Sequence, residues 1–340
     1  KAGAYLVDQL RITEPLKEVA AVSKSSKFKR LKASLGKDGT IAPGAESVPT
    51  RTVSLENTIA ENRPGNIPLT RDRGIKLVDV LNDKATMPDF VAQLSVEELE
   101  ALCRGDHLMD SALGAAGNAG VYGGVTPSLR EKGVTPVTTV DGPSGVRLTA
   151  SASLLPIGTA LACTWNDGVV EELYRMVGRE MNLNHADVLL APGMNIQRDP
   201  LGGRNFEYFS EDPLLTGQMG ASVVRGLQSQ GVAATPKHFG LNNQETRRNH
   251  TDARCSERAI REIYAKAFEI VVKTANPQNI MASYNRINGV YSHYNYDLFS
   301  SMLRDEWGYE GVVITDWWMQ PDKSPDNDNL YDNAYRVQAQ

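Results

Sequence analysis

Two hydrophobic patterns alternate along the chain from about residue 75 onward. Short apolar runs rich in Val, Ile and Ala predict buried strands over 134–140, 188–191, 232–235, 280–283 and 312–315. Between them, apolar residues recur at helical spacing and predict amphipathic helices over 168–181, 216–229, 257–274 and 296–307. Alternation of this kind predicts a parallel sheet covered by helices.

The pattern before residue 70 is different. Residues 3–12 have a strand-like pattern, and a basic stretch rich in Gly, Pro and Ser follows without sustained periodicity. We therefore expect a short strand and an extended linker over 1–70. The first helical pattern after it contains Ser95 as an N-cap, Glu98 three residues later and Gly105 as a stop signal.

Polar or charged residues follow nearly every predicted strand. They are Asp141, Asn195, Lys237 and His238, Tyr284 to Arg286, and Asp316. In a (β/α)8 barrel the carboxyl ends of all strands meet on one face, where active sites lie. A doubly wound sheet is the rival fold, but it would gather only the residues near its switch point. The sequence therefore predicts an α/β protein with a (β/α)8 TIM-like barrel over 71–340.

Composition and charge narrow the classes of function. Hydrophobic residues make up 41% and charged residues 23%, an ordinary globular balance. The net charge of -5 argues against nucleic acid as the main partner. No apolar run approaches the ~20 residues that span a bilayer, so no membrane partner is expected. The widely spaced Cys103, Cys163 and Cys255 are expected to be reduced thiols, which favours a cytoplasmic location.

The residues at the strand ends suit a neutral, polyhydroxylated ligand such as a sugar. Charged groups supply strong, directional hydrogen bonds to hydroxyls, and a tryptophan supplies a flat apolar surface. In this interpretation Asp316 attacks the anomeric carbon, and Trp317 or Trp318 lines the pocket. No glycine-rich phosphate loop follows a strand, and His238 and His250 lack a third ligand at metal spacing. Neither a nucleotide cofactor nor a metal is therefore expected.

Other interpretations of the same residues stay open at this point. Asp316 could be the N-cap of a following helix, and Lys237 and His238 could form a structural pair. Arg204 could simply pair with Glu207 or Glu211. Lys237 could also form a Schiff base, as in aldolases.

Five longer motifs resemble the barrel domain of glycoside hydrolase family 3. They are "TVDGPSGVR" (139–147), "NIQRDPLGGRNFEYFSEDPLLTG" (195–217), "KHFGLNNQET" (237–246), "IMASYNRINGV" (280–290) and "LRDEWGYEGVVITDW" (303–317). They occur in the family's order, and the match covers about residues 75–325. The resemblance implies a retaining β-glycosidase without a cofactor. A β-glucosidase would release terminal non-reducing β-D-glucose from a β-linked oligosaccharide or an aryl glucoside.

The resemblance also implies a role for each matching residue. Asp316 would be the nucleophile, and Tyr284 would lie beside it. The residues expected to bind or support the sugar are Asp141, Arg147, Arg204, Lys237, His238, Met281, Tyr284 and Trp317. The chain departs from the family at Thr315, where Ser is usual, and at Trp318, where Gly is common.

The general acid/base is expected to lie outside these residues. The stretch after "KHF" resembles the β-glucosidase and β-xylosidase branch, in which a second, α/β-sandwich domain supplies this glutamate. Glu207, Glu211 and Glu245 are expected to pair with arginine or lysine instead. Residues 3–19 resemble the end of a fibronectin-type-III-like domain, so we expect a longer protein with inverted domain order. A β-xylosidase or mixed-specificity glycosidase and a non-catalytic sugar-binding barrel remain alternative functions. Assembly into a homo-oligomer also stays open.

Overall fold

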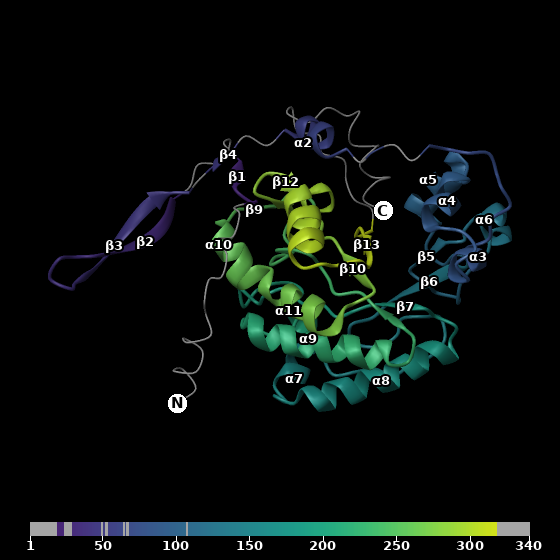
Figure 1. The fold of residues 1–340 in the computed structure, drawn as a ribbon. Coiled ribbons are helices and arrows are strands. Elements are labelled where there is room, and N and C mark those ends of the chain that lie inside the picture. The colour runs from purple at the N-terminus through teal and green to yellow at the C-terminus, as the bar shows by residue number, and fades with distance from the viewer. Residues whose placement is uncertain are drawn as a thin grey trace.

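The computed structural model describes residues 19–23, 29–48, 50–51, 54–63, 65, 68–106 and 108–317 (Figure 1). The strand-like segment 3–12 and Trp318 lie outside the described residues. No described helix is both long enough and apolar enough to cross a membrane.

The core contains a sheet whose strands run mostly parallel. Its first four strands lie side by side in chain order: β5 (Gly120–Gly123), β6 (Pro136–Asp141), β7 (Val188–Leu190) and β8 (Ala233–Ala234). β10 (Asn279–Met281) pairs in parallel with β13 (Val312–Ile314). A parallel bridge between Phe239 and Ala282 connects the ends of β8 and β10. All five strands predicted from apolar runs are therefore present in the predicted order.

The described residues do not close into an eight-stranded barrel. β6, β7, β8, β10 and β13 run parallel, but β5 runs antiparallel to β6. Trp317 bridges the open side through its indole, because Nε1 donates to the carbonyl of Ala119 at 2.7 Å. β13 and β5 exchange no backbone hydrogen bond within the described part of the chain. An α/β fold with a parallel sheet is thus observed, and the predicted closed barrel is not.

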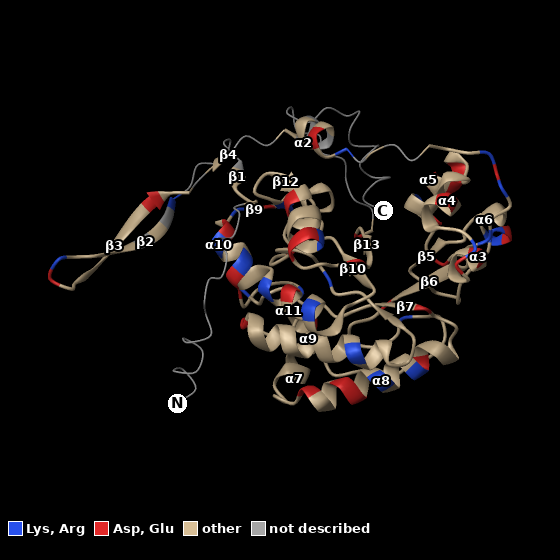
Figure 2. Ribbon diagram, viewed as in Figure 1, with Lys and Arg blue, Asp and Glu red and all other residues tan. Residues whose placement is uncertain are grey.

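Helices cover the outer face of this sheet. α8 (Asp167–Leu183), α9 (Pro213–Gln228) and α11 (Lys266–Ala275) pack side by side, with α9 in the middle (Figure 1). The predicted helix over 257–274 consists of α10 (Glu257–Ala259), a π-helical segment (Ile260–Tyr264) and α11. The predicted helix over 296–307 is a π-helix over Asp297–Glu306. Acidic and basic residues are interspersed along α8, α10 and α11 (Figure 2).

Short elements complete the described fold. α3 (Leu77–Leu81), α4 (Met87–Ala92), α5 (Val96–Arg104) and α6 (Pro127–Glu131) surround a small second core. α7 (Gly158–Ala162) precedes α8, and β9 (Asp252–Ala253), β11 (Arg286–Ile287) and β12 (Val290–Tyr291) form a small sheet. The predicted start and stop of α5 are confirmed, because Ser95 and Glu98 form a capping box and Gly105 ends the helix at a φ of 69°.

The amino-terminal segment is more structured than the predicted linker. β2 (Lys29–Leu35) and β3 (Ile41–Ser47) form an antiparallel hairpin that projects from the main body (Figure 1). β1 (Val22–Ser23), β4 (Thr50–Arg51) and α2 (Leu55–Asn62) lie beside the body. The expectation of an extended linker is therefore wrong for 29–47. Leu31, Ala33 and Leu35 of β2 alternate with polar residues, which is the period of a strand, but β3 does not show this alternation.

Candidate active site

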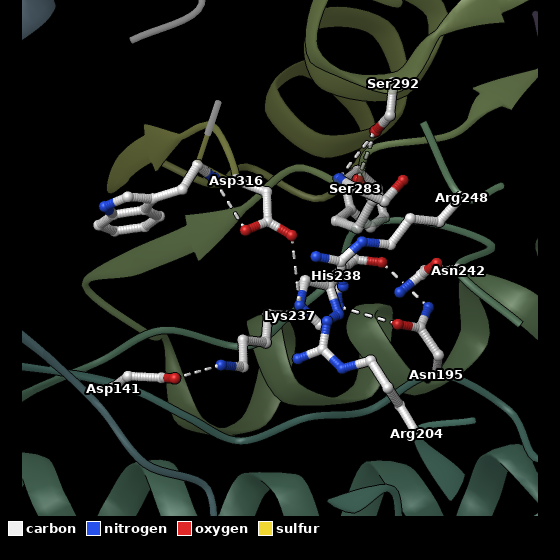
Figure 3. A network of polar contacts seen from close by, with 12 residues as sticks. Asp141, Asn195, Arg204, Lys237, His238, Asn242, Arg248, Ser283, Ser292 and Asp316 are labelled. Carbon is white, nitrogen blue, oxygen red and sulfur yellow. Dashed lines mark hydrogen bonds and ion pairs between the residues drawn. The ribbon is translucent and has the colours of Figure 1, made fainter. Parts of the chain in front are cut away.

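The predicted site residues gather where the parallel strands end. Asp141 is the last residue of β6, and Lys237 and His238 lie three and four residues beyond β8. Tyr284 follows β10, and Asp316 follows β13 after a single residue. Because neighbouring parallel strands end on the same edge, these side chains converge, as Figure 3 shows for Asp141, Lys237, His238 and Asp316.

Asp316 is a buried carboxylate with one oxygen left for a ligand. Its side chain is 12% exposed, and Oδ1 accepts the backbone N–H of Trp317 at 2.8 Å. Oδ2 has no hydrogen bond of standard geometry with any described residue, and His238 Nε2 lies 3.6 Å from it. Burial raises the pKa of Asp316, and the charges of Lys237 and Arg204 oppose this rise. Its ionised form is therefore poorly solvated.

The pKa of Asp141 is shifted in the opposite direction from that of Asp316, because two cations contact its carboxylate. Lys237 Nζ contacts its Oδ1 at 2.8 Å (Figure 3). Arg147 Nη1 contacts its Oδ2 at 2.8 Å. Burial alone would raise the pKa of Asp141, but Lys237 and Arg147 bring it below its usual range. The carboxylate can therefore accept hydrogen bonds from ligand hydroxyls. The ion pair also engages Lys237 with a carboxylate, which disfavours the Schiff-base alternative.

Two arginines approach the same space from different loops. Arg204 pairs with Glu207, as the sequence allowed. Arg248 pairs with Glu245 at 2.9 Å, and its guanidinium lies 4.4 Å from the centre of the Tyr284 ring. Burial and the nearby Asp316 raise the pKa of Tyr284, so its hydroxyl stays protonated. Glu207 and Glu245 are therefore both engaged in ion pairs with arginines.

His238 is a buried, neutral imidazole beside the nucleophile candidate. Burial and the charges of Arg204 and Lys237 lower its pKa well below 6.5. The side chain of Asn195 brackets its backbone, since Oδ1 accepts the N–H and Nδ2 donates to the C=O, both at 3.0 Å. The ring therefore presents a neutral polar group at a fixed place.

A comparison with known proteins decides the family. The family model described as "Glycosyl hydrolase family 3 N terminal domain" matches residues 126–334. This chain belongs to glycosyl hydrolase family 3. A beta-glucosidase from Ruminococcus albus is 40% identical over 99% of this chain and 35% of its own length. The chain thus spans about a third of this relative.

Two solved beta-glucosidase structures have a similar fold over the parts that match this chain. A beta-glucosidase from Paenibacillus barengoltzii superposes with a TM-score of 0.87 at 47% identity, covering 96% of this chain and 36% of that chain. Beta-glucosidase 3B from Thermotoga neapolitana, solved in complex with alpha-D-glucose, has a TM-score of 0.64 at 42% identity. It covers 68% of this chain and 34% of that chain.

The other residues predicted for the site of this family 3 chain differ in how far they are buried. Trp317 packs with Met281 and Ile314 on the inner face of the sheet. Met281 is 1% exposed, so it can support neighbours but offers little surface to a ligand. Arg147 has a side chain that is 74% exposed and lies at the rim. Glu211 is exposed.

Sequence reasoning missed three residues of this family 3 site. Arg248 and Asn242 lie in the irregular stretch after "KHF", where no periodic pattern marks a side chain as inward-facing. Tyr208 is a fully buried tyrosine, and its position in "NFEYFSEDP" is that of an ordinary core aromatic. Its hydroxyl, however, lies 3.3 Å from His238 Nδ1. In this mixed stretch of aromatic, polar and acidic residues, nothing distinguishes the Tyr208 hydroxyl from that of any other buried tyrosine.

Proposed function

We propose that this chain supplies the nucleophile side of a retaining β-glucosidase active site, with Asp316 as the nucleophile. The observation that carries the proposal is the buried Asp316 carboxylate, whose Oδ2 has no hydrogen-bond partner of standard geometry among the described residues. A carboxylate in this state at the end of a parallel strand can form a covalent bond to the anomeric carbon of a bound sugar.

The neighbours of Asp316 suit the glycone of a β-glucoside. The anionic Asp141 can accept hydrogen bonds from hydroxyls, and Lys237, His238 and Arg204 can donate them. Tyr284 keeps its hydroxyl proton beside Asp316 and can steady the carboxylate before attack. Trp317 would support the apolar face of the ring, with Met281 beneath it and Arg147 at the rim. Glucose bound to the Thermotoga neapolitana relative supports this choice of sugar.

The second carboxyl of the reaction would come from an α/β-sandwich domain outside this chain. A retaining glycosidase needs it about 5–5.5 Å from the nucleophile. Glu207 and Glu245 are engaged with Arg204 and Arg248, so neither is poised to protonate a leaving group. The curated relative is about three times as long as the matched part, which leaves room for such a domain. In the same protein, further strands would complete a (β/α)8 barrel.

Replacement of the nucleophile tests this function. In the protein that joins this chain to the proposed sandwich domain, Asp316→Asn removes the attacking charge and changes little volume. We expect hydrolysis of 4-nitrophenyl β-D-glucoside to fall by several orders of magnitude. Circular dichroism should remain unchanged.

The control makes the same atomic exchange away from the site. Asp212 is the exposed N-cap of α9, where Asn serves as well as Asp. Asp212→Asn should retain wild-type turnover. Wild-type turnover in Asp316→Asn would contradict the proposal.

A further inference from the structure

We propose that Tyr208 is a positioning residue for His238. Its hydroxyl donates a hydrogen bond to Nδ1 of His238 and so keeps the ring proton on Nε2, the nitrogen that faces Asp316. The catalytic meaning of this arrangement rests on the proposed function, but the arrangement itself can be measured without any turnover.

The two nitrogens of the His238 ring face different groups. Nδ1 lies 3.3 Å from the hydroxyl oxygen of Tyr208, and Nε2 lies 3.6 Å from Oδ2 of Asp316. A neutral imidazole carries a proton on only one of these nitrogens. The buried environment keeps His238 neutral, so one of two tautomers must be present.

The Asp316 side favours a proton on Nε2. The carboxylate of Asp316 is an acceptor, and its Oδ2 has no hydrogen bond of standard geometry with a described residue. A protonated Nε2 would present a donor to this oxygen. The other tautomer would turn a nitrogen lone pair toward a carboxylate, which is repulsive in a buried site.

The Tyr208 side favours the same tautomer. Asn242 Nδ2 lies 3.1 Å from the carboxylate of Glu245 and 3.3 Å from the Tyr208 oxygen. The carboxylate can only accept, so this end of Asn242 is its amide donor and the Tyr208 oxygen accepts from it. The single proton of Tyr208 is then free for His238 Nδ1 at 3.3 Å. The alternative acceptor, the backbone carbonyl of Asn242, is more distant at 3.5 Å.

The surrounding contacts hold this chain of groups in place. Tyr208 is 2% exposed, and its ring meets the His238 ring edge to face at 6.4 Å. Asn195 fixes the backbone of His238 on the other side (Figure 3). Arg248 holds Glu245, which in turn orients Asn242. The hydrogen-bonded series from Glu245 through Asn242 and Tyr208 therefore ends at Nδ1 of His238.

With this tautomer, the Nε2–H group of His238 is an uncharged hydrogen-bond donor with a fixed direction. An Nε2–H can stabilise the Asp316 carboxylate, or a sugar hydroxyl placed between them, without neutralising the charge of the nucleophile. A mobile tautomer would present a donor in part of the molecules only.

The test is ¹⁵N NMR of the histidine rings in this chain, labelled selectively at histidine. The chain has 5 histidines, and His238→Gln identifies the His238 signals by their loss. At neutral pH we expect a protonated Nε2 and an unprotonated, hydrogen-bonded Nδ1. Tyr208→Phe deletes only the hydroxyl. It should shift Nδ1 toward the position of a nitrogen without a hydrogen bond and allow the second tautomer to appear.

The matched control is Tyr264→Phe, which deletes the hydroxyl of another buried tyrosine that contacts Arg198 rather than His238. It should leave the His238 signals unchanged. A protonated Nδ1 in the wild type would overturn the proposal, even if Tyr208→Phe failed to fold. Unchanged His238 signals in Tyr208→Phe, or equal shifts in both variants, would also overturn it.

These results are independent of the β-glucosidase assignment. The tautomer can be as proposed in a chain without glycosidase activity, and that outcome would count against the proposed function only. Loss of turnover in Asp316→Asn together with a protonated Nδ1 would count against Tyr208 only.

Discussion

At the residue scale, the same burial acts in opposite directions on two neighbouring side chains. Burial disfavours whichever form is charged, so it raises the pKa of Asp316 and lowers the pKa of His238. Asp141 shows that close cations can outweigh burial, since Lys237 and Arg147 lower its pKa. The site therefore holds a firmly ionised acceptor, a neutral imidazole and a carboxylate with a poorly solvated charge.

The buried His238 should make the protein sensitive to acid. In the unfolded chain a histidine binds a proton near pH 6.5, whereas folded His238 does so only at much lower pH. Stability is then lost as pH falls below about 6.5, at no more than about 1.4 kcal/mol per pH unit from this group. We expect urea denaturation between pH 6.5 and 5 to show this slope, and His238→Gln to show a shallower one.

The pH dependence of stability that comes from His238 can be distinguished from the contributions of Asp316 and of other histidines. Asp316 has a raised pKa, so its contribution to the pH dependence of stability has the opposite sign. This group lowers the stability of the fold as pH rises above the pKa of an ordinary Asp side chain. The exposed His185 is the matched control, and His185→Gln serves to measure a generic histidine loss. Equal slopes in the wild type and His238→Gln would contradict a neutral, buried His238.

At the element scale, α9 is the helix that anchors the outer layer. It packs between α8 and α11, and most of its residues are buried. Close contact with α8 depends on Gly226, because a Cβ there would lie 2.4 Å from the backbone oxygen of Glu171. Backbone cannot move aside as a flexible side chain can, so a substitution must separate the two helices.

Gly226→Ala should therefore destabilise the fold, by about 1–3 kcal/mol, as overpacking does in other cores. Gly168→Ala is the control, because Gly168 lies in the first turn of α8 and its nearest atom is a side-chain oxygen at 3.4 Å. There alanine should be neutral or slightly stabilising, given its better helix propensity. Thermal unfolding measures both, and a Gly226→Ala variant as stable as the wild type would refute the close crossing.

The strands were predictable because buried parallel strands are continuous apolar runs. β5 was not, since "GVYG" is short, has glycine at both ends and owes its conformation to pairing with β6. The hairpin over 29–47 alternates only weakly. Asp316, Lys237 and His238 were found because they directly follow strands, whereas Arg248 and Asn242 depend on a loop path that no local pattern encodes.

At the scale of the whole molecule, distant segments are joined by buried polar groups. Glu257 accepts the backbone N–H groups of Val19 and Ala20 at 2.9 and 3.1 Å, and Asn288 donates to the carbonyl of Ala20 at 2.9 Å. Residues 19 and 20 are thus fixed to Glu257 and to Asn288, which lies four residues after Tyr284. A segment upstream of the sheet therefore belongs to the same folded unit.

Trapping of a covalent bond between Asp316 and a sugar tests the proposed function most directly. A 2-deoxy-2-fluoro-β-D-glucosyl fluoride slows release of such an intermediate, so that the labelled residue can be found by peptide mapping and mass spectrometry. The measurement uses the protein that joins this chain to the proposed sandwich domain. We expect one fluoroglucosyl group on the peptide that contains Asp316, and none in Asp316→Asn. Label on another carboxylate, or an active enzyme that accumulates no label, would contradict it.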